Sequence, residues 1–82
     1  MSNNFKAYIE ELDYAKFVFL ELGRFPTIQE DKRKHAAHNA VCEEVVKNFK
    51  VLGYTGDLTD RQAIGKFVCL KEGRRDLVDW AN

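Results

Sequence analysis

The chain has 82 residues, of which 45% are apolar and 12% aromatic, and its thirteen basic and thirteen acidic residues give a formal net charge of zero. This size predicts one domain, residues 1–82, with enough apolar residues for a core. The balanced charge argues against a strongly basic nucleic-acid-binding protein, and the single Pro and five Gly argue against disorder.

The first predicted helix covers about residues 5–22, with Asn3 or Asn4 as its N-cap. Apolar residues with helical spacing mark one face: Tyr8, Leu12, Ala15, Phe19 and Leu22. A second apolar side joins it in the last two turns: Tyr14, Phe17, Val18 and Leu20. Because large exposed apolar patches are rare on monomers, this helix is either central to the domain or partly in an interface.

A capping box, Thr27 followed by Glu30, opens the second predicted helix after the helix-ending pair Gly23 and Pro26. This helix is expected from Ile28 to near Leu52, with Gly53 as a left-handed cap. Residues 29–34 are polar, whereas the second half has apolar residues at helical spacing. The second half is therefore expected to be buried, and the sequence leaves open whether residues 29–36 are helix or loop.

A similar signature, Thr59 followed by Gln62, predicts a third helix over about residues 60–72, ending at Gly73. Gly65 within it indicates a close helix crossing. Residues 74–81 are expected to form a short terminal helix that places Leu77 and Trp80 on the core. The predicted fold is all-α, a bundle of three main helices plus the short one; the alternative is α+β, with a hairpin within residues 67–80.

The strongest metal-binding pattern is His35, His38 and Cys42, preceded by Asp31, because the spacings of three and four place them on one helix face. A closed zinc site needs ligands from elsewhere in the fold. We therefore favour histidines at a polar border and a cysteine in the core, and predict no cofactor. A metal-stabilised helical domain is the weaker alternative.

Six basic residues could form a phosphate-binding patch if the fold brings them together: Arg24, Lys32, Arg33, Lys34, Arg74 and Arg75. The best helix-turn-helix candidate, residues 60–81, has Asp76 and Asp79 on its would-be recognition helix, and these carboxylates would repel phosphate. A small nucleic-acid-binding regulator is therefore the alternative function.

An enzyme is not expected, because the sequence has no Gly-rich phosphate loop, nucleophile elbow or zinc-protease motif. Aromatic and apolar residues could instead form a docking surface: Tyr14, Phe17, Val18, Tyr54 and Trp80. We hypothesise a non-enzymatic protein-binding module, a small regulator or inhibitor that docks on a larger protein partner. A phage or plasmid accessory protein, such as a lysis or host-factor regulator, is a natural setting.

A homodimer through the second apolar side of the first helix is a further alternative. No apolar run reaches the roughly 18–20 residues of a membrane span. Cys42 and Cys69 are too few and too far apart to indicate a disulfide framework, so we expect reduced thiols and a cytoplasmic protein.

Overall fold

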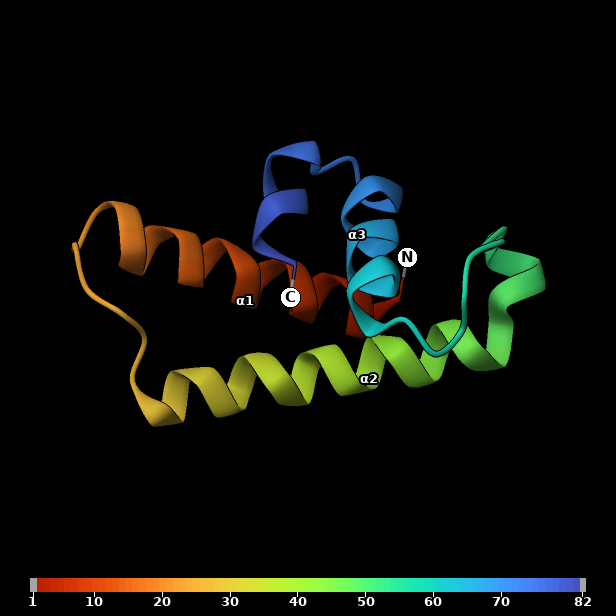
Figure 1. Cartoon of the computed structure of the whole chain (residues 1–82), viewed down its shortest axis with the longest axis horizontal. Coiled ribbons are helices and arrows are strands. Elements are labelled where there is room, and N and C mark those ends of the chain that lie inside the picture. Colours follow the sequence, from red (N-terminus) through yellow and green to blue (C-terminus); the bar gives the residue numbers. More distant parts are fainter. Residues whose placement is uncertain (1, 82) are drawn as a thin grey trace.

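A computed structural model describes residues 2–81, which contain three α-helices, a C-terminal 3-10 helix and no strand (Figure 1). The elements are α1 (Asn3–Leu20), α2 (Ile28–Leu52), α3 (Arg61–Lys71) and η1 (Arg75–Trp80). The all-α prediction is confirmed. The hairpin alternative is wrong, because residues 67–71 complete α3 and residues 75–80 form η1.

Helix α1 begins earlier than expected because Ser2, rather than Asn3 or Asn4, is its N-cap. The Ser2 hydroxyl accepts hydrogen bonds from the amides of Asn4 at 3.1 Å and Phe5 at 3.2 Å. The helix also ends earlier, at Leu20, and Gly23 turns the chain with a left-handed φ of 64°. Leu22 therefore lies in the connection rather than on a helix face.

Helix α2 is continuous over Ile28–Leu52, so residues 29–36 are helical. The predicted capping box is present: Thr27 Oγ1 accepts from the Glu30 amide at 3.2 Å, and Glu30 Oε1 accepts from the Thr27 amide at 2.8 Å. Gly53 ends the helix with a φ of 81°, as predicted. Asn48 kinks the last turns with a non-helical φ of −126°.

Helix α3 is capped by Asp60, whose Oδ1 accepts from the Ala63 amide at 3.0 Å. The expected cap, Thr59, instead donates its hydroxyl and its amide to Asp57 Oδ1 at 2.6 and 2.8 Å. After Gly73 turns the chain with a φ of 72°, η1 buries Leu77 fully. Trp80 is partly buried against the core, as the sequence predicted.

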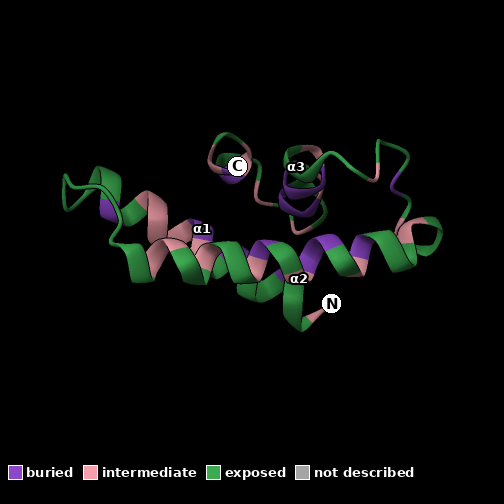
Figure 2. Ribbon diagram, turned by 60° about the horizontal axis from the view of Figure 1, so that its bottom comes forward, coloured by how far each residue is buried: buried purple, intermediate pink, exposed green. Residues whose placement is uncertain are grey.

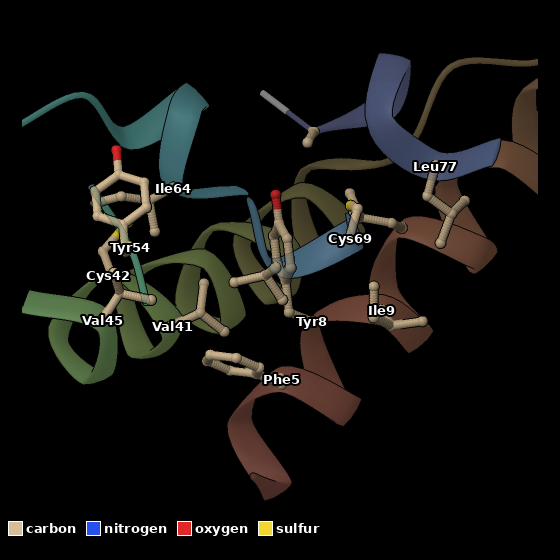
Figure 3. Packing of buried hydrophobic residues seen from close by; sticks show 13 residues of the cluster. Phe5, Tyr8, Ile9, Val41, Cys42, Val45, Tyr54, Ile64, Cys69 and Leu77 are labelled. Atoms are coloured by element: carbon tan, nitrogen blue, oxygen red, sulfur yellow. The ribbon is translucent and has the colours of Figure 1, made fainter. Parts of the chain in front are cut away.

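The helices form two layers. Helices α1 and α2 lie side by side as one layer, and α3 and η1 pack on one face of that pair (Figures 1 and 2). The core lies where the layers meet, and its cluster of buried side chains comes from all four elements (Figure 3). The largest fully buried side chains are Tyr8, Leu12, Val18, Val41, Val45, Ile64, Val68, Cys69 and Leu77. Helix α2 and the end of α1 extend past the second layer, giving extents of 39 × 22 × 21 Å. None of the described helices is long and apolar enough to cross a membrane.

Candidate protein-interaction surface

Large apolar side chains are exposed at the end of the molecule where α1 connects to α2. Six of them, each between 46% and 80% exposed, define a surface that we call the apolar tip: Phe17, Phe19, Leu20, Leu22, Phe25 and Ile28. Three of the six lie at the end of α1, and the other three follow in the connection and at the first position of α2. The apolar tip is thus built from one stretch of twelve residues, 17–28.

The apolar tip is exposed because the second layer stops short of it. Figure 2 shows the α1–α2 connection projecting past α3 and η1, with exposed residues over most of that end. Phe19 lies at the boundary, where its ring meets the edge of Trp80 at a centroid distance of 5.8 Å. On its other side Phe19 contacts Phe25 at 6.0 Å. The apolar tip therefore continues from the packed core outward.

Glu30 fixes the connection that carries the apolar tip. Its carboxylate accepts hydrogen bonds from Arg24 Nη1 at 2.9 Å, from the Thr27 amide at 2.8 Å and from the Tyr14 hydroxyl. Arg24 Nη1 also donates to the Phe25 carbonyl at 3.1 Å. The Arg24 guanidinium, with the Thr27 amide and the Tyr14 hydroxyl, holds the pKa of the Glu30 carboxyl well below its usual range. The connection is thus tied to both helices.

The five predicted docking residues are not brought together on one exposed surface. Phe17 is 46% exposed, whereas Val18 is fully buried and Tyr54 nearly so. Tyr54 packs its ring against Phe67 and donates its hydroxyl to the Asp57 carbonyl at 2.8 Å. These contacts place Tyr54 in the core cluster. Tyr54 and the buried Val18 are therefore closed to a partner unless the chain rearranges.

Tyr14 and Trp80 are each partly buried by contacts within the chain. The Tyr14 ring lies 5.2 Å from the Arg33 guanidinium carbon, and Trp80 packs against the core and Phe19. Phe17 alone of the predicted docking residues therefore belongs to the apolar tip. Phe25 was not predicted as a docking residue. Its position could have indicated exposure, because it is an apolar residue in a connection between Gly23 and Pro26.

Half of the predicted basic residues are neutralised within the chain. Arg24 pairs with Glu30 at 2.9 Å, and Arg33 pairs with Glu11 at 3.4 Å. Arg74 holds Asp13 through two hydrogen bonds, of 2.8 and 2.6 Å, and also pairs with Asp76. Lys32 and Arg75 are exposed on different helices and Lys34 is partly buried. The ion pairs of the three arginines weaken the case for a phosphate-binding patch.

The predicted metal ligands do not converge. His35 is exposed, with Nε2 3.5 Å from Asp31 Oδ2, whereas His38 is buried and donates from Nε2 to the Arg61 carbonyl at 2.8 Å. Cys42 is also buried, and burial raises the pKa of its thiol. Within residues 2–81, no three His, Cys, Asp or Glu side chains are placed to hold a metal ion.

Tyr8, His38 and Gly65 form a buried contact between α1, α2 and α3, which we call the core node. The Tyr8 and His38 rings stack at 5.2 Å, and both residues are at most 3% exposed. The Tyr8 hydroxyl has no hydrogen-bond partner among the described residues, and burial raises its pKa. Burial lowers the pKa of His38, so the ring is neutral at pH 7. The side chains of the core node are closed to solvent, so a ligand cannot reach them unless the helices separate.

Comparison with known proteins found no matching family model, no matching curated protein and no matching solved structure. The apolar tip is therefore interpreted from its own geometry.

Proposed function

We propose that this chain is a non-enzymatic protein-binding module that docks on a larger protein partner through the apolar tip. The observation that carries the proposal is the gathering of six exposed large apolar side chains at one end of the molecule. Together they expose on the order of 600 Å² of apolar surface, given the area of a large side chain. This total lies over two sides of the end of α1, with Phe19 and Phe25 in contact on one of them. Exposed apolar surface of this extent marks interaction surfaces.

The partner segment that fits this surface is an amphipathic helix. Helix α3 and η1 already cover the other part of the same face of α1 and α2 with apolar side chains, and Phe19 with Phe25 continues that face beside Trp80. A helix beside η1 would meet Phe19, Phe25 and Ile28 with residues spaced by three or four. Since Arg24 is already paired with Glu30, the contacting face of the partner is expected to be apolar rather than charged.

The ion pairs within the chain favour docking on a protein over binding to a nucleic acid. The ion pairs of Arg24, Arg33 and Arg74 neutralise three of the six basic residues predicted to contact phosphate. The exposed side chains of the apolar tip are uncharged and require no counter-charge. A chain that binds without catalysing would act on its partner as a regulator or an inhibitor.

Site-specific photocrosslinking tests the proposal. Benzoylphenylalanine replaces Phe25, which is 80% exposed in the apolar tip, and in a matched control it replaces Val51, which is 89% exposed at the opposite end of α2. The chain is irradiated in an extract of the cells that encode it. The expected result is a crosslink to one protein from position 25 that position 51 does not give. Equal crosslinking from both positions, or none from position 25, would contradict the proposal.

A further inference from the structure

The charges around the apolar tip allow it to contact the apolar tip of a second copy of the chain. A two-fold interface brings each surface patch against the same patch of the other copy, so unpaired charges of one sign would repel. Around the apolar tip Arg24 pairs with Glu30 and Lys16 pairs with Asp76. Asp31 contacts His35, whose ring carries a charge only when it is protonated. The exposed Glu21 and Lys32 carry opposite signs. Exposed charges of both signs therefore border the apolar tip, and a two-fold contact can bring opposite signs of the two copies together.

The area also fits a dimer. A stable interface buries about 800 Å² on each partner. The apolar tip exposes on the order of 600 Å² in total over two sides of α1, and the partly buried Trp80 borders the side that holds Phe19. Polar residues beside the tip would supply the rest of the interface. Homodimer interfaces are more apolar than other interfaces, with charge depleted from their centre. The composition of the apolar tip matches that type of interface.

The connection that carries the apolar tip is already held in place by hydrogen bonds within the monomer. The Glu30 carboxylate holds Arg24, Thr27 and Tyr14, and Arg24 in turn holds the Phe25 carbonyl. A surface that is fixed before association loses less conformational entropy when it binds. The same argument applies to any occupant, and in purified protein the only available occupant is another copy.

We propose that, when no partner is bound, a second copy of this chain covers the apolar tip and forms a two-fold symmetric homodimer. The inference rests on the proposed function, because the partner and the second copy would share one surface. The dimer must then dissociate before the partner docks, so self-association lowers the apparent affinity for the partner. Formation of the dimer thereby regulates the docking surface.

Sedimentation equilibrium of the purified chain across a wide concentration range tests the homodimer. The probe variants are Phe25→Glu and Ile28→Glu in the apolar tip, and the matched control is Val51→Glu, which places the same charge on an equally exposed apolar position at the other end of α2. We expect a monomer–dimer equilibrium for the unmodified chain and for Val51→Glu. Each tip variant should weaken dimerisation by roughly 30-fold or more, as for loss of a central interface residue.

Three other results would overturn the homodimer. The first is an unmodified chain that stays monomeric at all concentrations, and the second is a dimer that Phe25→Glu and Ile28→Glu leave intact. The third is a dimer that Val51→Glu disrupts to the same extent as the tip variants. Circular dichroism of each variant verifies that helices form, which is expected because all three positions are exposed.

A second measurement requires no substitution. Mixing isotope-labelled with unlabelled chains should give intermolecular nuclear Overhauser effects between the Phe19 and Phe25 rings and Ile28, and their absence in a sample that sediments as a dimer would place the interface elsewhere. The photocrosslinking result is independent of both measurements. A monomer that crosslinks a partner from position 25 would overturn the homodimer and leave the docking function standing. A dimer that crosslinks no partner from position 25 would contradict the docking function and leave the homodimer standing.

Discussion

At the scale of single residues, the core node shows why α3 has a glycine in its middle. A Cβ atom on Gly65 would lie 2.5 Å from the Tyr8 hydroxyl oxygen, 3.3 Å from the Ala81 Cβ and 3.4 Å from His38 Nε2. The first of these distances is a clash with the end of a rigid, fully buried ring. The close crossing that the sequence predicted at Gly65 is therefore confirmed, and its cause is the Tyr8 hydroxyl.

We expect Gly65→Ala to lower the free energy of unfolding by about 1–3 kcal/mol, because overpacking outweighs the roughly 1 kcal/mol by which Ala favours a helix. Tyr8→Phe should change stability by less than about 1 kcal/mol, because the hydroxyl that it removes has no hydrogen-bond partner among residues 2–81. In the double variant the clashing atom is gone, so the cost of Gly65→Ala should fall by about 1 kcal/mol or more. Urea denaturation of the four proteins measures this coupling, and strictly additive changes would contradict the clash.

His38 should make stability depend on pH below neutrality. Burial lowers its pKa in the folded chain below the ordinary value of 6.5, and the Arg61 guanidinium nearby acts in the same direction. Below pH 6.5 the unfolded chain therefore binds a proton that the folded chain does not, so the free energy of unfolding falls as the pH drops. His38→Gln keeps a donor for the Arg61 carbonyl but does not titrate. Urea denaturation between pH 5 and 7.5 should show a shallower pH dependence for this variant, and equal slopes would show that His38 is not responsible.

At the scale of elements, the sequence predicted α2 closely because its end signals are local. Thr27, Glu30 and Gly53 act within one helical turn of themselves, so nothing distant has to be known. The start of α3 was misassigned by one residue because Asp57 competes for the Thr59 hydroxyl and amide. This competition depends on the turn before the helix, which the helix pattern alone does not specify. Residues 29–36 are helical because the capping box starts the helix and most of these polar residues, such as Gln, Glu, Lys and Arg, favour helix.

Neighbouring cap residues give a matched comparison at α3. Asp60→Ala removes the acceptor of the Ala63 amide and should lower the free energy of unfolding by about 1 kcal/mol, as for other lost N-caps. Thr59→Ala removes only an exposed hydroxyl bond to Asp57 and should cost less than about 0.5 kcal/mol. Thermal or urea denaturation separates the two. A larger cost for Thr59→Ala than for Asp60→Ala would show that the capping box expected from the sequence operates in solution.

At the scale of the whole molecule, the sequence could not locate the apolar tip. Helical spacing placed Phe19 on the same face as Tyr8 and Leu12, and that placement is sound for a face of one helix. Whether a position on that face is buried depends on how far the second layer extends, and η1 ends beside Phe19. Val18 shows the converse, because it is fully buried although it lies on the second apolar side. Burial at the end of a helix is therefore a property of the assembled layers.

The short η1 helix should govern the stability of the whole chain, because its fully buried Leu77 packs in the same cluster as side chains of α1, α2 and α3 (Figure 3). Leu77→Ala should lower the free energy of unfolding by about 2–4 kcal/mol, a large part of the total of roughly 4–12 kcal/mol for a domain of this size.

Trp80 is the single tryptophan, so its fluorescence reports on η1 while far-ultraviolet circular dichroism reports on all helices. With one shared core, both signals should change at the same urea concentration in the original chain and at a lower common concentration in Leu77→Ala. Val51→Ala, at a position 89% exposed, is the control and should change stability by less than about 0.5 kcal/mol. A fluorescence transition that precedes the loss of helix would show instead that η1 detaches on its own and that α1, α2 and α3 do not depend on it.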